Sequence, residues 1–473
     1  MEKNLLRARW FVIIAFAVAC LATLNYNGAF FDEAIYITAG LRTFEGHGLA
    51  DRYMTWFAGS LAWPILAGAG YTLGGILGTR VVAAALGTLT LAAVGRAATN
   101  LFHERVGFWT TLAFALNGPF FALSRLGAYD ILSLSAIAVS FWAVTELAHQ
   151  GDRTWLLVAA GAYPLAVFAK YPIGLMILPL LATLVLLRNE RAKVDVGMLI
   201  FIGGAIGLAI YLPLREQISV FFDWRLQNRP GFGVPLSTIA FAIVYLSTLP
   251  ALLAVAGWVQ AKRRRALATV LLATMGIWPI YHIVFQDPVG TNKHLVFGYL
   301  FAYPLVGLTL STLWSAERAA IIKRVAVGGI VVVLAIAGVV QVNQANHSWP
   351  NLTFATRFLT ERVQPGDKLL INESWPFTLG LYDQGRIYSP WDVYDTYRVT
   401  NEATAPDICE FEWVVDVKGS YSWPPEVAAA LDACESYQRV YSHASRVINL
   451  GADFNYVSYP VETVIWQQQP EAQ

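Results

Sequence analysis

The chain has 473 residues, of which 56% are hydrophobic and only 14% are charged. Because soluble globular domains average roughly 25% charged residues, this composition excludes an ordinary soluble enzyme and indicates repeated membrane crossing. The formal net charge is +1, which gives no indication of nucleic-acid binding. We therefore expect an α-helical polytopic membrane protein with no nucleic-acid partner.

Apolar runs that can cross a bilayer occur along the first 343 residues. A spanning helix needs about 17–25 mostly apolar residues, and we place about eleven such runs. The fifth and sixth runs are separated by Lys170 and Pro172. The predicted spans are residues 10–29, 79–101, 106–124, 129–148, 154–170, 173–187, 197–214, 236–260, 266–285, 294–314 and 325–342. Residues 1–343 are thus predicted to form a transmembrane domain.

Positive charges collect in alternate connections between these spans. They precede the first span and follow the sixth, eighth and tenth: Lys3, Arg7 and Arg9; Arg188, Arg191 and Lys193; Lys262, Arg263, Arg264 and Arg265; Arg318, Lys323 and Arg324. Since Lys and Arg are enriched in cytoplasmic loops, the pattern predicts a cytoplasmic N-terminus. The loop after the first span and the whole chain after residue 343 are then extracytoplasmic.

The C-terminal region, residues 344–473, has a different composition, with turn residues, acids and short β-rich runs. Strands are predicted at 368–372, 386–388, 413–416, 439–441 and 455–459, and a helix at 425–433. We expect a small extracytoplasmic α/β domain that binds an acceptor or covers the catalytic opening. Cys409 and Cys434 both fall in it, where a disulfide is chemically permitted, whereas Cys20 lies in the first span.

Two adjacent acids, Asp32 and Glu33, follow the first predicted span and are flanked by apolar and aromatic residues. Acids at the membrane boundary suit a substrate that is part lipid and part polar. The outer loop that begins here, residues 30–78, is rich in aromatic residues: Trp56, Phe57, Trp63 and Tyr71. This pattern favours helices that lie along the membrane interface.

Further ionisable residues lie where the spans meet the outer face. They are Arg125 and Asp130 between the third and fourth spans, Lys170 after the fifth, and Lys293 and His294 before the tenth. Ionisable groups at membrane depth are costly and usually have a partner or a task. Each also has a simpler interpretation: Arg125 and Asp130 as mutual loop partners, Lys170 as a snorkelling side chain, and Lys293 with His294 as a plain loop.

Together these residues suit the transfer of a sugar from a lipid phosphate. The phosphate leaves without a general acid once cations meet its developing charge. Candidates for that contact are Lys170, Lys293, His294 and Arg125. Asp32 is the candidate base that takes the proton of the attacking hydroxyl, and Glu33 would orient the acceptor or the base, or share a metal ion. Attack from the far side inverts the anomeric carbon.

Several ordered motifs resemble the C-type membrane glycosyltransferases that use polyprenyl-phosphate sugars. The likeness is strongest to the branch of protein O-mannosyltransferases, aminoarabinose transferases and galacturonosyltransferases. The motifs are Asp32-Glu33-x-x-Tyr36, Trp63-Pro64, Gly78-Thr79-Arg80, Gly95-Arg96, Leu101-Phe102, Arg105-Val106-Gly107, Ser124-Arg125-Leu126 with Tyr129-Asp130, and Phe168-Ala169-Lys170-Tyr171-Pro172. Beyond about residue 190 the likeness reduces to topology, the Lys293-His294 site and Tyr303-Pro304.

The resemblance implies a base at Asp32, a second functional acid at Asp130, and phosphate contacts from Lys170 and the Lys293-His294 site. Tyr36, Tyr129 and Tyr171 belong to the same motifs and are candidate substrate contacts. The chain departs from the family in two places. Tyr171 stands where a glycine commonly follows the lysine, and Lys293-His294 stands where Arg-Tyr is frequent.

The expected function is that of an inverting glycosyltransferase in the inner membrane, which moves a single sugar to an acceptor hydroxyl on the outer face. The acceptor would be a glycan, a lipid or a protein, and membrane lipids surround the enzyme. No cofactor is required by this chemistry, although a divalent cation is used by some relatives. The alternatives are a transporter or lipid flippase, and a ligase or polymerase that moves a whole lipid-linked glycan. Clustering of the charges at one face favours the transferase.

Overall fold

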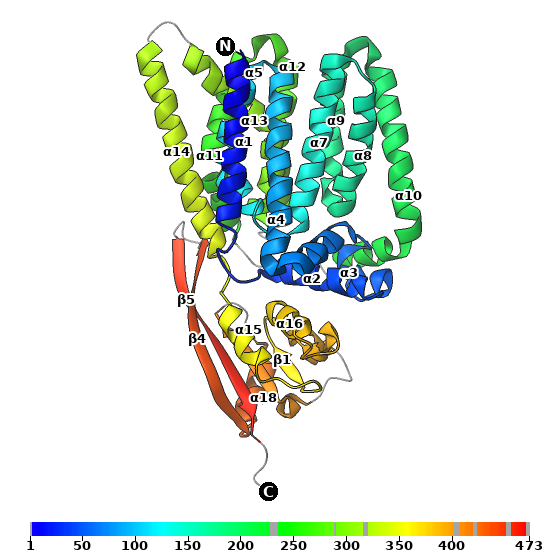
Figure 1. The fold of residues 1–473 in the computed structure, drawn as a ribbon, viewed down its shortest axis with the longest axis vertical. Helices are drawn as coiled ribbons and strands as arrows, with labels where there is room; N and C mark the ends of the chain where they lie inside the picture. The colour runs from blue at the N-terminus through cyan, green and yellow to red at the C-terminus, as the bar shows by residue number, and fades with distance from the viewer. Residues whose placement is uncertain are drawn as a thin grey trace.

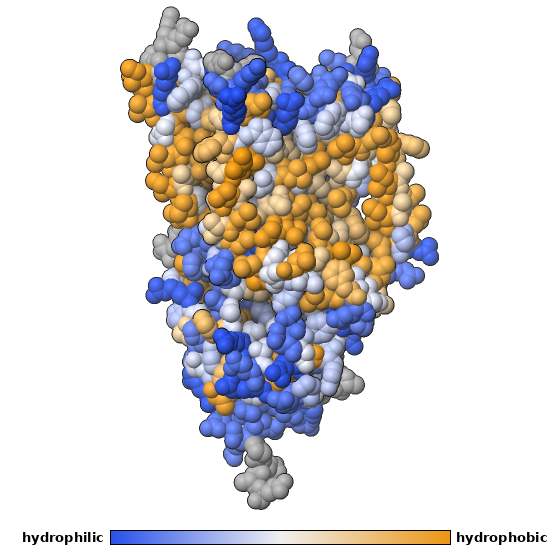
Figure 2. Space-filling model, in the orientation of Figure 1, coloured by the Kyte–Doolittle hydropathy of each residue, from blue (hydrophilic) through white to orange (hydrophobic). Residues whose placement is uncertain are grey.

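The computed structural model places a helical bundle above a smaller domain that contains a β-sheet (Figure 1). It describes residues 2–227, 235–287, 290–315, 320–401, 407–419, 423–450 and 456–469. On the face that Figure 2 shows, an apolar belt covers the bundle, and hydrophilic residues cover its free end and most of the sheet domain. The predicted fold class, a polytopic helical protein with a small C-terminal α/β domain, is confirmed.

Nine segments of the described chain are helices long and apolar enough to cross a membrane. The bundle contains α1 (Glu2–Ala22), α4 (Ala62–Leu101), α5 (Glu104–Ala115), α6 (Gly118–Leu123), α7 (Tyr129–Gln150), α8 (Thr154–Ala169), α9 (Ile177–Arg188), α10 (Ala192–Gln227), α11 (Leu236–Gln260), α12 (Arg265–Phe285), α13 (Thr291–Ser315) and α14 (Ala320–Asn346). Short 3-10 turns, η2 (Tyr171–Met176), η3 (Asn189–Arg191) and η4 (Lys262–Arg264), connect some of them.

The predicted count of about eleven spans exceeds these nine candidates at two places. The helix at 154–169 has 16 residues, which is short for a span. The run at 106–124 is split into α5 and α6, because Asn117 caps α6 and accepts a hydrogen bond from Phe120 N. Both segments still lie within the bundle (Figure 1). Of the predicted cytoplasmic cations, Arg318 lies outside the described residues.

The first helix also differs from its prediction, because it begins at Glu2 and ends at Ala22 instead of covering 10–29. Polar and turn-forming residues follow, and Asn27 donates hydrogen bonds to the carbonyl oxygens of Asn346 and Trp349 at 2.9 and 3.1 Å. Asn and Gly favour turns over helix. The segment therefore leaves the bundle early and joins the end of α14.

Short helices form in the loop between the first two spanning helices, where the sequence predicted them. Helix α2 (Phe31–Phe44), η1 (Gly48–Ala50) and α3 (Met54–Phe57) lie across the foot of the bundle (Figure 1). A Cβ atom on Gly40 would come within 2.1 Å of Pro64 O, so glycine permits the close packing of α2 on α4. Gly75, with φ +60°, kinks α4 between its interfacial start and its spanning part.

The C-terminal domain contains a five-stranded sheet with the order β2-β1-β3-β5-β4. The strands are β1 (Leu369–Ile371), β2 (Val393–Tyr394), β3 (Trp413–Lys418), β4 (Tyr437–Leu450) and β5 (Tyr456–Gln468). Strands β1 and β2 pair in parallel, as do β1 and β3, whereas β5 pairs antiparallel with β3 and β4. The predicted strand at 386–388 is wrong, since these residues form bends, and Asn455 of the last predicted strand lies outside the described residues.

Helices and a disulfide complete this domain. They are α15 (Thr353–Thr360), α16 (Ser374–Asp383), η5 (Pro390–Asp392), α17 (Thr396–Asn401), η6 (Ile408–Glu410) and α18 (Pro425–Ala433). The bounds of α18 agree with those of the helix predicted at 425–433. Cys409 and Cys434 are bonded, with Cα atoms 5.6 Å apart, so the permitted disulfide is present. Helices α15 and α16 were not predicted from the sequence, because no side chain caps the start of either helix.

The sheet domain contacts the foot of the bundle through α16 and also near the end of α14. Trp375 of α16 packs against Tyr53 and Trp56, with ring centroids 5.3 and 5.1 Å apart. Near the end of α14, the backbone N–H of Ile448 donates to His347 O at 2.7 Å. These contacts position the domain below α2, beside the predicted catalytic acids.

Candidate active site

Local sequence places the charged residues at helix ends. Asp32 and Asp130 are each the second residue of a helix, α2 and α7, where carboxylates interact favourably with the helix dipole. Helix α8 ends at Ala169 because Pro172 cannot continue it and disfavours helix at the preceding residue, which leaves Lys170 extended. Lys293 lies in the first turn of α13.

These helix ends meet at the foot of the bundle and form a cluster of alternating charges. Lys293 Nζ lies 2.7 Å from Asp32 Oδ2 and 3.7 Å from Asp130 Oδ2. Lys170 forms the second ion pair with Asp130. The side chains of Lys170 and Asp130 are 5% and 1% exposed, against 29% for Asp32. Asp32 is therefore the open carboxylate of the cluster, and Asp130 is its buried one.

The simpler interpretations of three of these residues are wrong. Lys170 does not snorkel, because its ammonium is buried against Asp130. Lys293 and His294 belong to the first turn of α13 and not to a plain loop. His294 Nε2 lies 2.8 Å from Lys170 Nζ, so His294 is attached to the same cluster.

Aromatic rings line the cluster. Lys170 Nζ lies 5.0 Å from the ring centroid of Tyr129, and the rings of Tyr36 and Tyr129 are 5.0 Å apart. Burial, together with Tyr129 and Asp32, raises the pKa of Tyr36 well above its ordinary value, so its hydroxyl stays protonated. Tyr171 points elsewhere, since it donates a hydrogen bond to Ala58 O at 2.9 Å.

Glu33 lies in a separate, fully buried ion pair with Arg80. Its Oε1 and Oε2 accept hydrogen bonds from Arg80 Nε and Nη2 at 2.9 and 2.8 Å. They also accept from the backbone N–H groups of Gly127 and Phe30 at 2.8 and 2.9 Å. Glu33 thus ties the start of α2 to α4 and to the segment before α7. This position favours a structural role over the catalytic one predicted for it.

Arg125 is directed toward the ends of α1 and α14. Its guanidinium donates to Thr23 O at 2.9 Å and to Asn346 Oδ1 at 2.8 Å, and it lies 4.7 Å from the ring centroid of Tyr26. Arg125 and Asp130 are therefore not mutual loop partners. Arg125 joins the membrane domain to the start of the sheet domain, which favours a structural role over a phosphate contact.

Sequence reasoning missed two residues near the cluster, His282 and Trp278 of α12. His282 Nε2 lies 3.1 Å from His294 Nδ1, and the rings of Trp278 and His294 are 4.7 Å apart. The sequence offered one signal for His282, because this histidine lies within the predicted apolar span 266–285. In the part of the chain that the structure describes, no group of three or more His, Cys, Asp or Glu side chains is placed to hold a metal ion.

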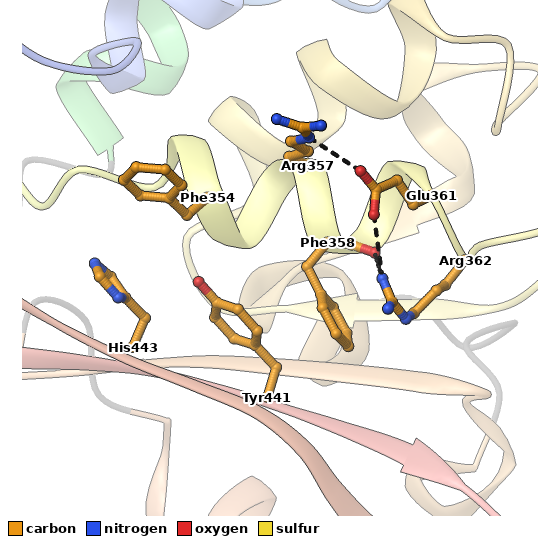
Figure 3. A pocket seen from close by; sticks show the side chains of 7 residues that line it. All are labelled: Phe354, Arg357, Phe358, Glu361, Arg362, Tyr441 and His443. Carbon is orange, nitrogen blue, oxygen red and sulfur yellow. Dashed lines mark hydrogen bonds and ion pairs between the residues drawn. The ribbon is translucent and has the colours of Figure 1, made fainter.

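A second candidate site is a groove of about 520 Å³ on the sheet domain, between α15 and β4 (Figure 3). Its lining residues are Phe354, Arg357, Phe358, Glu361, Arg362, Tyr441 and His443. Arg357 Nε lies 3.0 Å from Glu361 at one edge, and Phe354 is 61% exposed. The groove is open to solvent, so the enclosed charges at the foot of the bundle are the stronger candidate for catalysis.

The chain resembles known proteins in sequence and in fold. Residues 61–215 match the family model described as dolichyl-phosphate-mannose-protein mannosyltransferase. The fold is similar to that of ArnT from Cupriavidus metallidurans bound to undecaprenyl phosphate, with a TM-score of 0.62 and 15% identity over 96% of this chain and 98% of that chain. For ArnT in the apo state the TM-score is 0.61 and the identity 16%, over 96% and 97%. No curated protein sequence matches the chain.

The family match and the shared fold confirm the resemblance to the C-type glycosyltransferases that use polyprenyl-phosphate sugars. The matched range contains Arg80, Asp130 and Lys170. The multi-pass helical architecture is that of a membrane protein. Together these findings support a membrane glycosyltransferase that uses a lipid-linked sugar.

Proposed function

We propose that the chain is an inverting glycosyltransferase that transfers a single sugar from a polyprenyl-phosphate donor to an acceptor hydroxyl. The observation that carries this proposal is the cluster of Asp32, Lys293, Asp130 and Lys170 at the foot of the bundle. It offers two ammonium groups for a phosphate and one open carboxylate for a hydroxyl. The cluster lies at one end of the apolar belt, where a lipid phosphate would be held at headgroup depth.

The ammonium groups of Lys170 and Lys293 would receive the donor phosphate. When the bond between the anomeric carbon and the phosphate oxygen breaks, the electron pair goes to that oxygen. Charge-assisted hydrogen bonds from the lysines stabilise the developing charge. Asp130 contacts both lysines, so it holds them in position for this contact.

Asp32 would act as the general base. In the ligand-free arrangement it is paired with Lys293. A bound phosphate competes for that ammonium group, which frees a carboxylate oxygen to take the proton of the acceptor hydroxyl. The acceptor oxygen then bonds to the anomeric carbon on the face opposite the leaving phosphate, and the configuration inverts.

The proposed reaction takes place on the extracytoplasmic face of the inner membrane. The disulfide between Cys409 and Cys434 supports this orientation, because disulfides persist in oxidising compartments. The start of α14, which contains Lys323 and Arg324, lies at the end of the bundle away from the sheet domain (Figure 1), which agrees with the positive-inside rule. Residues 344–473 are proposed as the extracytoplasmic domain that borders the acceptor path.

We further propose that no cofactor is required, because lysine ammonium groups supply the charge that the leaving phosphate needs. Treatment of the purified enzyme with EDTA tests this point. Activity that is lost with EDTA and restored by a divalent cation would show that a metal ion takes part.

The experiment that tests the function compares wild type with Asp32→Asn on a panel of radiolabelled polyprenyl-phosphate sugars. Each is incubated with and without membrane extract as the source of acceptor. Label that leaves the lipid only with wild type and extract supports the transferase and identifies the sugar. Asp432→Asn, which changes an exposed carboxylate of α18 outside both candidate sites, is the matched control.

Two other outcomes would favour the alternatives. Movement of the intact labelled lipid across proteoliposome membranes, without loss of its sugar, would indicate a flippase. Transfer from a lipid-pyrophosphate glycan, with single sugars left in place, would indicate a ligase or polymerase.

A further inference from the structure

His282 is a buried, titratable residue for which the proposed reaction has no task. Its side chain is 0% exposed and lies near the end of α12. Its Nδ1 contacts the backbone carbonyl oxygen of Asp287, and its Nε2 lies 3.1 Å from His294 Nδ1. His294 Nε2 in turn lies 2.8 Å from Lys170 Nζ. These contacts form a continuous row from a backbone carbonyl to a lysine of the charge cluster.

The carbonyl oxygen of Asp287 determines the direction of every hydrogen bond in this row. A carbonyl oxygen only accepts, so His282 Nδ1 carries a proton. In the neutral imidazole the Nε2 of His282 then accepts from the Nδ1–H of His294. This leaves a lone pair on His294 Nε2, which accepts a hydrogen bond from the ammonium of Lys170.

These hydrogen bonds determine how the ammonium group of Lys170 is oriented. An ammonium group has three N–H donors in a fixed tetrahedral arrangement. One donor is directed to Asp130 and another to His294. Once two directions are fixed, the third is fixed as well. Tyr129 and Phe297 lie beside the ammonium, with ring centroids 5.0 and 5.9 Å from Nζ.

We propose that His282 is a positioning residue that, through the tautomer of His294, aims the free N–H of Lys170 at the donor phosphate. This inference rests on the proposed function and assigns a role to a residue that does not touch the substrate. Without His282, the proton of His294 is free to sit on Nε2, where it opposes the N–H groups of Lys170. Trp278 holds the plane of the His294 ring, so the ring cannot turn away readily.

The test measures binding of undecaprenyl phosphate to the full-length protein in lipid nanodiscs. His282→Phe removes both nitrogen atoms while keeping a ring, and we expect it to weaken binding about tenfold, the loss of one well-directed charge-assisted hydrogen bond. His282→Gln keeps a donor for Asp287 O and an acceptor for His294, so it should restore affinity to within about threefold.

A double-mutant comparison separates positioning from general structural damage. In a Lys170→Ala background, His282→Phe should cause no further loss of affinity, because its target is absent. An equal loss with and without Lys170 would overturn the proposal. If His282→Phe does not fold, as judged by thermal unfolding, His282→Leu replaces it in the same comparison, and unchanged binding in a folded variant would also overturn the proposal.

Transfer activity is recorded separately with the donor identified by the radiolabel panel. If wild type binds undecaprenyl phosphate but transfers no sugar, the proposed function fails while the coupling between His282 and Lys170 is still measured. If wild type transfers sugar and the coupling is zero, the inference about His282 fails and the function stands.

Discussion

The ammonium of Lys293 lies 2.7 Å from the carboxylate of Asp32 and 3.7 Å from that of Asp130, so one cation bridges two acids. The two acids differ in environment, since Asp32 is 29% exposed and Asp130 only 1%. Under the proposed function, this difference gives the two acids different roles. The exposed carboxylate can meet an acceptor hydroxyl, whereas the buried one holds the cations.

Asp32→Asn should lower kcat by a factor of about 10²–10⁴, the usual contribution of a positioned general base. The amide keeps the size of the side chain but does not take up a proton. Binding of undecaprenyl phosphate should remain close to that of wild type, which is checked by the nanodisc assay. Near-normal turnover in a folded Asp32→Asn protein would remove Asp32 as the base.

Lys170→Ala should weaken donor binding by about 10- to 100-fold, because a charge-assisted hydrogen bond to the phosphate is lost. The KM for the acceptor should change little. The variant also leaves Asp130 without one of its cations, so thermal unfolding is measured in parallel. An effect confined to acceptor KM would mean that the donor binds elsewhere.

Glu33→Gln should destabilise the protein by about 3–5 kcal/mol, since it leaves Arg80 buried and uncompensated. The double variant Glu33→Gln/Arg80→Met should recover part of this loss, because it removes the remaining buried charge. Thermal unfolding in detergent gives both values. Normal stability with abolished turnover in Glu33→Gln would instead support the catalytic role first predicted for Glu33.

Reduction of the Cys409–Cys434 disulfide should destabilise the sheet domain by about 3 kcal/mol, the value expected for closing a loop of this size. The two cysteines are 25 residues apart in the sequence. Limited proteolysis of residues 344–473 with and without a reductant measures the effect. Two free thiols at these positions in the native protein, by mass spectrometry, would contradict the prediction.

Asp416→Asn should stabilise the sheet domain at neutral pH. Burial raises the pKa of Asp416 above its ordinary value, so the folded domain binds a proton more tightly than the unfolded chain. The stability that protonated Asp416 contributes is present below the ordinary pKa of about 3.9 and is lost as the pH rises through the raised value. The advantage of Asn over Asp should therefore grow with pH across that window, as measured by thermal unfolding. A difference in stability between Asp416→Asn and wild type that does not change with pH would contradict this prediction.

Much of the site was predicted from the sequence because charged residues are rare in apolar spans. Asp32, Asp130, Lys170, Lys293 and His294 stood out for this reason and are joined in one cluster in the structure. Their local positions also follow from sequence, through helix starts and the Pro172 break. The helices of the loop after the first span were predicted from its aromatic residues, and the disulfide was permitted by the predicted extracytoplasmic location of Cys409 and Cys434.

The sequence by itself determined the membrane class, the order of the elements and which ionisable residues face one end of the bundle. Only the tertiary structure decided which charges pair. Glu33 and Asp32 are adjacent in sequence, yet one contacts Arg80 of α4 and the other Lys293 of α13. Successive residues of a helix point in directions about 100° apart, so neighbours in the chain enter different environments. The fold therefore buries Glu33 against α4 and leaves Asp32 partly exposed beside Lys293, which is the arrangement that the proposed function uses.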